Sequence, residues 1–135
     1  MSNKTVTYIF YAAALFNIGG ILTFSLFFTN PLIAKYDPIV FSSFGQFAII
    51  LWGLAYLAVS KTFKHVKALM LVFAFEKLVY VIAWIVFLLQ KGSMLPDIFN
   101  ESFITGMFFG GYGIGDFIFG CFFAWVGIKG DKIGS

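Results

Sequence analysis

The chain has 135 residues, of which 61% are hydrophobic and 11% are charged, and its net charge is +3. A soluble domain carries about 25% charged residues, so this chain cannot cover a water-facing surface, and its long apolar runs indicate a membrane protein. Cys121 and His65 are the only residues of their types, which excludes an intramolecular disulfide and a histidine-rich metal site. We therefore expect no metal and no cofactor. We also expect no nucleic-acid partner, because the positive net charge comes from lysines that membrane topology places on the cytoplasmic side.

The first apolar run, near residues 6–29, is predicted to be a transmembrane helix. Its apolar stretch exceeds the roughly 7–15 residues of a signal-peptide core, so an uncleaved span is favoured. Asn17 lies near its middle, and Asn30-Pro31 closes it. The second run, near residues 39–60, opens at Asp37-Pro38 and carries Gln46.

The third run, near residues 66–90, carries two adjacent ionisable residues, Glu76 and Lys77. Charged groups at the bilayer centre are costly and usually face partners or a cavity. A lysine side chain reaches only about 6 Å, so Lys77 is too deep to snorkel to water. We expect Lys77 to be paired, deprotonated or facing a wet cavity.

The fourth run, near residues 103–128, carries Asp116 close to its centre. Small residues repeat along it every seven positions and on a neighbouring strip, and this pattern predicts a face for close helix packing. The glycines of this face are Gly106, Gly110, Gly113, Gly120 and Gly127. The face could pack within the chain or form a dimer contact.

The four runs predict one all-α transmembrane domain over residues 1–135, an up-down-up-down bundle in the lipid bilayer. Six lysines, in both tails and in the second connection, fall on one side of the membrane, and two fall on the other. Because cytoplasmic loops carry the excess of lysine, both termini are predicted to be cytoplasmic.

Polar residues of the four runs are predicted to form a layer at one depth. Lys77 lies 11 residues from Val66, and Asp116 lies 12 residues from Ile128 on a helix running the other way. Both therefore sit roughly 17 Å from the cytoplasmic boundary, which favours an ion pair between them. The candidate binding or proton-linked site consists of Glu76, Lys77, Asp116, Asn17, Gln46, Tyr80 and Tyr112. Polar side chains also hold membrane helices together, so the layer could serve only to set the helix register. No catalytic residue is assigned.

The third and fourth runs resemble a loose class of uncharacterised bacterial small four-helix inner-membrane proteins. The matching elements are Lys77, the segment KGSMLP ending at Pro96, and GDFIFGCFFAW around Asp116, and they cover about half the chain. The resemblance implies a four-helix fold in a bacterial inner membrane, and it implies no activity.

Three hypotheses of function remain open. The leading one is a small-molecule or ion-binding protein, with a proton-linked carrier in which Glu76 titrates as its specific form; transport would then need a dimer. The second is an accessory or assembly subunit of a larger membrane complex, with glycine and aromatic patches that face lipid until a partner covers them and with a closed, dry polar layer. The third is an enzyme acting on a lipid-like substrate, with Glu76 or Asp116 as acid or base and a pocket open sideways to lipid. We favour a protein that is not an enzyme. The direction in which a pocket near the polar layer opens would distinguish the three hypotheses.

Overall fold

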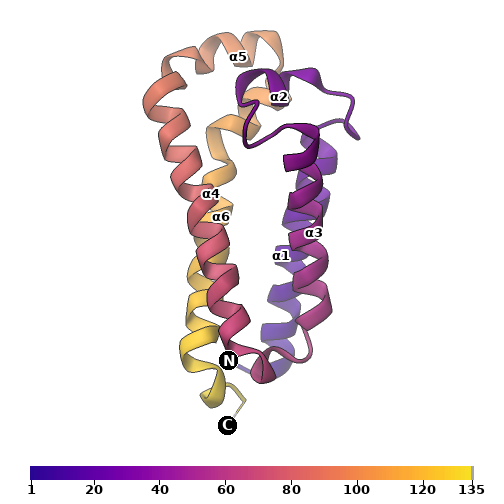
Figure 1. Cartoon of the computed structure of the whole chain (residues 1–135), viewed down its shortest axis with the longest axis vertical. Coiled ribbons are helices and arrows are strands. Elements are labelled where there is room, and N and C mark those ends of the chain that lie inside the picture. The colour runs from indigo at the N-terminus through magenta and orange to yellow at the C-terminus, as the bar shows by residue number, and fades with distance from the viewer. Residues whose placement is uncertain (135) are drawn as a thin grey trace.

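The computed structural model describes residues 1–134, and all of its regular elements are helices. Figure 1 shows the long helices along the long axis of the molecule and the short helices α2 and α5 across the end opposite the termini. The long helices are α1 (Asn3–Phe24), α3 (Ser43–Val59), α4 (Lys67–Lys91) and α6 (Phe103–Lys129). The short elements are α2 (Pro31–Tyr36), α5 (Leu95–Glu101) and the 3-10 turns η1 (Phe63–His65), η2 (Gly92–Met94) and η3 (Gly130–Lys132).

Three helical segments are long and apolar enough to cross a membrane: Asn3–Phe24, Lys67–Glu101 and Phe103–Lys132. This confirms the prediction of an all-helical integral membrane protein. The apolar helix α3 has 17 residues and a length of about 25 Å, which is shorter than a hydrocarbon core of about 30 Å. It begins at Ser43, whereas the sequence prediction began its second run near residue 39.

The helices pack mainly as two pairs, α1 with α3 and α4 with α6 (Figure 1). Polar side chains begin several of them. Ser2, Ser42 and Ser102 accept hydrogen bonds from the third backbone amide that follows, at the starts of α1, α3 and α6. Such N-caps satisfy amides that would otherwise lack partners at a helix start.

Helix α1 ends at Phe24, five residues before the predicted end of the first run, in a left-handed turn. Leu26, Phe27 and Phe28 have φ angles of 52°, 55° and 67°. Left-handed backbone costs roughly 1–2 kcal/mol for each residue with a side chain, so other contacts must hold this turn. Asn30 does so, because its side-chain amide donates to Phe24 O and to Thr105 Oγ1 on α6.

Helices α2 and α5 are joined at the end of the molecule opposite the termini. Lys35 and Tyr36 both donate to the Glu101 carboxylate, and Lys91 Nζ donates to the Tyr36 carbonyl over 2.8 Å. The hydrogen bond to Glu101 raises the pKa of the Lys35 ammonium. Because these groups are largely exposed, their ion pair adds little stability.

The buried core falls into two hydrophobic clusters. The termini-side cluster includes Phe10, Phe73 and Phe123, and the α2/α5-side cluster includes Phe41, Phe87 and Phe109. Many of these rings contact one another edge to face or in tilted arrangements. A layer of buried polar residues belongs to neither cluster.

Candidate functional site around a buried ion pair

Lys77 on α4 and Asp116 on α6 form an ion pair inside the protein. Lys77 Nζ donates to Asp116 Oδ1 over 2.8 Å and to Asn17 Oδ1 on α1 over 2.7 Å. The side chains of Lys77 and Asp116 are 1% and 8% exposed. The same ammonium lies 5.4 Å and 5.3 Å from the ring centres of Phe16 and Tyr56, where cation–π attraction adds to the pairing.

Asn17 links the two helix pairs. Its side-chain oxygen accepts from Lys77, and its amide nitrogen donates to the Ile49 carbonyl of α3 over 3.1 Å. One side chain thus touches α3 and α4 from α1. Gly53 allows this approach, since a Cβ at that position would lie 2.6 Å from Ile18 and 3.2 Å from Asn17.

The heptad glycines of α6 face α4 and α5 within the chain. A Cβ built at Gly106 would lie 2.4 Å from the Phe99 ring, at Gly113 2.3 Å from Trp84, and at Gly127 2.6 Å from Leu71. At Gly120 it would lie 3.1 Å from Lys77 Cβ, so this glycine lets the lysine lie close to α6. Gly110 borders Phe99 more loosely, at 3.9 Å.

Glu76 is buried beside the ion pair without a salt bridge of its own. Its Oε1 accepts a 2.5 Å hydrogen bond from the Tyr56 hydroxyl, while its Oε2 has no hydrogen-bond partner among the described residues. The residue is 6% exposed, so it faces neither water nor lipid to any extent. The salt bridge of Lys77 goes to Asp116, and the buried trio therefore carries one carboxyl more than it has ammonium groups.

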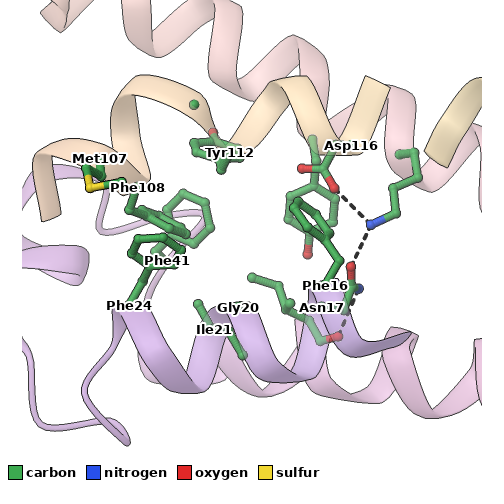
Figure 2. Close-up of a pocket in the computed structure, with 14 residues that line it drawn as sticks. Phe16, Asn17, Gly20, Ile21, Phe24, Phe41, Met107, Phe108, Tyr112 and Asp116 are labelled. Atoms are coloured by element: carbon green, nitrogen blue, oxygen red, sulfur yellow. Dashed lines mark hydrogen bonds and ion pairs between the residues drawn. The ribbon is translucent and has the colours of Figure 1, made fainter. Parts of the chain in front are cut away.

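The ion pair borders a cavity of about 230 Å³. Its walls come from α1, α3, α4, α6 and the turn before α3, and most of its lining is aromatic or aliphatic. Figure 2 shows Asn17 and Asp116 at one end of this space and Phe24, Phe41, Met107 and Phe108 at the other. The cavity is larger than the roughly 150 Å³ engineered cavities that bind benzene, so it has room for a ligand.

Tyr80 and Tyr112 both line this cavity. The Tyr112 hydroxyl has no hydrogen-bond partner among the described residues. Tyr80 also borders a second pocket of about 390 Å³ between α3 and α4, which Trp52, Phe75 and Glu76 line as well. Tyr80 therefore stands between the two spaces.

Gln46 lies apart from the Lys77 group. Its side-chain amide donates to the Phe41 carbonyl over 2.9 Å, and it is not part of the cavity lining. Tyr56, which was not among the candidate site residues, is the group that contacts Glu76. Within residues 1–134 there is no cluster of three histidine, cysteine, aspartate or glutamate side chains that could hold a metal ion.

No protein-family model, no curated protein and no solved structure matches this chain.

Proposed function

We propose that all four long helices cross a membrane, with α3 as the shortest span and both termini in the cytoplasm. Two features support this. The termini lie at the same end of the molecule (Figure 1), and six of the nine lysines belong to the tails, to the α3–α4 connection or to the first or last turns of the helices that adjoin them. The resemblance described above favours a bacterial inner membrane.

We infer that the protein binds a small, membrane-soluble molecule in the cavity beside Lys77 and Asp116. The observation that carries this proposal is the position of the ion pair at one end of a largely apolar space of about 230 Å³. Ligand sites are typically apolar pockets with a few placed polar groups, and intramembrane charges commonly mark function. Polar groups that served only to hold helices together would need no such space.

Binding is coupled to a proton at Glu76 in this proposal. The Glu76 carboxyl accepts a hydrogen bond from Tyr56 but has no salt bridge among the described residues. Burying its charged form is therefore costly, whereas burying its protonated, neutral form is not. Glu76 precedes Lys77 in the chain, and Tyr80, one turn further on, lines the cavity. A proton on Glu76 would therefore change the electrostatic field at the ligand. Carriage across the membrane would involve a homodimer or larger complex.

The test uses purified protein in lipid nanodiscs and an alkyl diazirine photolabel, with the labelled residues located by mass spectrometry. We expect saturable labelling of cavity residues such as Phe24 and Met107, and competition by unlabelled lipid-soluble compounds. The control variant Leu15→Ala removes an exposed side chain outside the cavity and should label as the wild type does. Labelling that is non-saturable, or confined to lipid-facing residues, would contradict a binding function.

A membrane enzyme acting on a lipid-like substrate is the second candidate. Asp116 lines the cavity, and a Cβ built at Gly20 or Gly111, which line it too, would meet no atom within 4 Å, so the wall between α1 and α6 leaves room for a substrate to enter from the side. Turnover of a cavity ligand would favour it over the binding function. The accessory-subunit hypothesis required glycines that face lipid until a partner covers them. Its support is weaker, because Gly106, Gly113, Gly120 and Gly127 pack within the chain.

A further inference from the structure

The cavity is elongated along the helices, and its two ends differ in chemistry. Along α1 it runs from Asn17 to Phe24, about 10 Å at 1.5 Å per residue, and along α6 from Asp116 to Met107, about 13 Å. Figure 2 shows Asn17 and Asp116 at one end, Tyr112 between the ends, and Phe24, Phe41 and Phe108 with the Met107 thioether at the other end. A ligand that fills this space must have a polar head and an extended apolar body.

The side of the cavity between α1 and α6 has room for a chain. Gly20 on α1 and Gly111 on α6 both line it, and a Cβ built at either residue would meet no atom within 4 Å. Both glycines are partly exposed. This contrasts with Gly115, also on α6, where a Cβ would lie 2.4 Å from the Phe16 ring and where α1 and α6 close together. The gap therefore opens sideways only on the α2/α5 side of the ion pair.

The charges at the polar end select the head group. The Lys77 ammonium is already engaged by Asp116, Asn17 and two aromatic rings. One oxygen of Asp116 accepts from Lys77, and Figure 2 shows the other turned toward the Tyr112 side of the cavity. The Tyr80 and Tyr112 hydroxyls also line the cavity and can donate or accept, while Glu76 borders the second pocket, so this oxygen of Asp116 is the charged acceptor that the cavity offers. An anionic head placed against this oxygen would meet a like charge in a buried site, whereas a hydroxyl or amide head can donate to it.

We propose that the ligand is a single-chain amphiphile with a hydrogen-bond-donating head, such as a long-chain alcohol or amide. The head donates to Asp116, and the chain lies between α1 and α6, beside Gly20 and Gly111, with its end among Phe24, Met107 and Phe108. This inference rests on the proposed binding function and specifies the class of molecule and its orientation.

The head-group test compares 1-decanol with decanoate as competitors of a diazirine-tagged decanol in nanodiscs at pH 8. We expect decanoate to compete at least tenfold more weakly than decanol. The decanol hydroxyl can donate a hydrogen bond to the Asp116 carboxylate, whereas the decanoate carboxylate would place a second negative charge beside it. In Asp116→Asn the discrimination should fall, since the amide can donate to a carboxylate. Equal competition in the wild type, or preference for decanoate, would overturn the inference and leave the binding function standing.

The orientation test locates the crosslink from a diazirine at the chain terminus. Labels are expected on Phe24, Met107 or Phe108, and labels near Phe10 or Phe123 would overturn the proposed orientation. Gly111→Leu should abolish labelling by filling the gap, whereas Gly110→Leu, on the adjacent residue outside the cavity lining, should preserve it. Thermal unfolding checks that both variants fold. If no probe of either head group labels the cavity saturably, the binding function itself fails.

Discussion

Lys77 and Asp116 meet over 2.8 Å in a buried polar layer that has one aromatic cluster on each side. A buried ion pair contributes little net stability relative to apolar residues of similar size, whereas breaking it leaves a charge without compensation. The pair therefore requires α4 and α6 to pack in the one register that keeps Lys77 beside Asp116, a requirement that hydrophobic packing alone would not impose. Substitution of one or both partners separates these effects.

Asp116→Asn is expected to destabilise the protein by about 3–5 kcal/mol, because the Lys77 ammonium loses its counter-charge in an apolar interior. The double variant Lys77→Met/Asp116→Leu should recover most of this loss, since it leaves no charge buried without a partner. Unfolding in mixed micelles measures both. A double variant as unstable as Asp116→Asn would show that packing at these positions, rather than charge, is critical.

The double variant also separates structure from function. If the ion pair only holds helices together, a stable Lys77→Met/Asp116→Leu protein should bind probes as the wild type does. We expect it instead to lose the preference for donor head groups, because the Asp116 acceptor is gone. Photolabelling with diazirine-tagged decanol, with decanoate as competitor, measures this on the same samples.

Glu76→Gln is expected to preserve the fold and remove a pH-dependent step. The glutamine oxygen can accept from Tyr56 as the carboxylate does, but the side chain cannot exchange a proton. We expect the melting temperature and probe affinity of the wild type to vary with pH between 5 and 9, and those of Glu76→Gln to vary less. Tyr56→Phe is the matched variant, because it removes the hydroxyl partner and keeps the titratable carboxyl. Unchanged pH profiles in Glu76→Gln would argue against a proton at this residue.

The juxtaposition of Lys77 and Asp116 could be anticipated from the sequence by simple counting. Both residues lie 11 or 12 positions from the ends of antiparallel helices joined by a short connection, so equal depth follows from a constant helical rise. The same count misses Tyr56. It is three residues from the end of α3, while Glu76 is nine residues from the start of α4, so their depths differ by about 9 Å. The Tyr56 hydroxyl and the Glu76 carboxyl nevertheless meet in a 2.5 Å hydrogen bond, which the count does not predict.

Local conformation between α1 and α3 could not be anticipated in the same way. Asn30-Pro31 was interpreted as a simple break, but the asparagine caps α2 and the proline begins it, which is a favourable start for a helix. The left-handed turn before it contains Leu26, Phe27 and Phe28, none of which favours positive φ. The hydrogen bond from Asn30 to Thr105 on α6 helps to hold this turn, together with local bonds to Ser25, and no local sequence pattern reports the contact with α6.

Phe27→Gly should be neutral or stabilising by up to about 1 kcal/mol, because glycine adopts the left-handed region without steric cost. The matched control is Leu15→Gly. Leu15 and Phe27 are both 72% exposed, but Leu15 lies in the middle of α1, where glycine costs about 1 kcal/mol. Thermal unfolding in detergent compares the two. A loss of stability in Phe27→Gly as large as that in Leu15→Gly would mean that the turn is not strained.

Gly113→Ala and Gly111→Ala, two residues apart on α6, should behave in opposite ways. The added methyl at Gly113 would lie 2.3 Å from the Trp84 ring, whose indole also donates to the Phe109 carbonyl, so we expect a loss of about 1–3 kcal/mol. At Gly111 the methyl would meet no atom, and alanine favours the helix, so stability should hold or rise. Equal effects at the two positions would contradict the packing of α6 on α4.

The placement of both charges of the pair on α4 and α6 bears on how the chain enters a membrane. These helices follow one another and pack together, so Lys77 and Asp116 can neutralise each other within a single helical hairpin. The hairpin of α1 and α3 then contributes Asn17 and Tyr56, which are both uncharged, to the finished layer. Insertion of the two halves would at no stage require the lysine to enter the bilayer apart from its counter-ion.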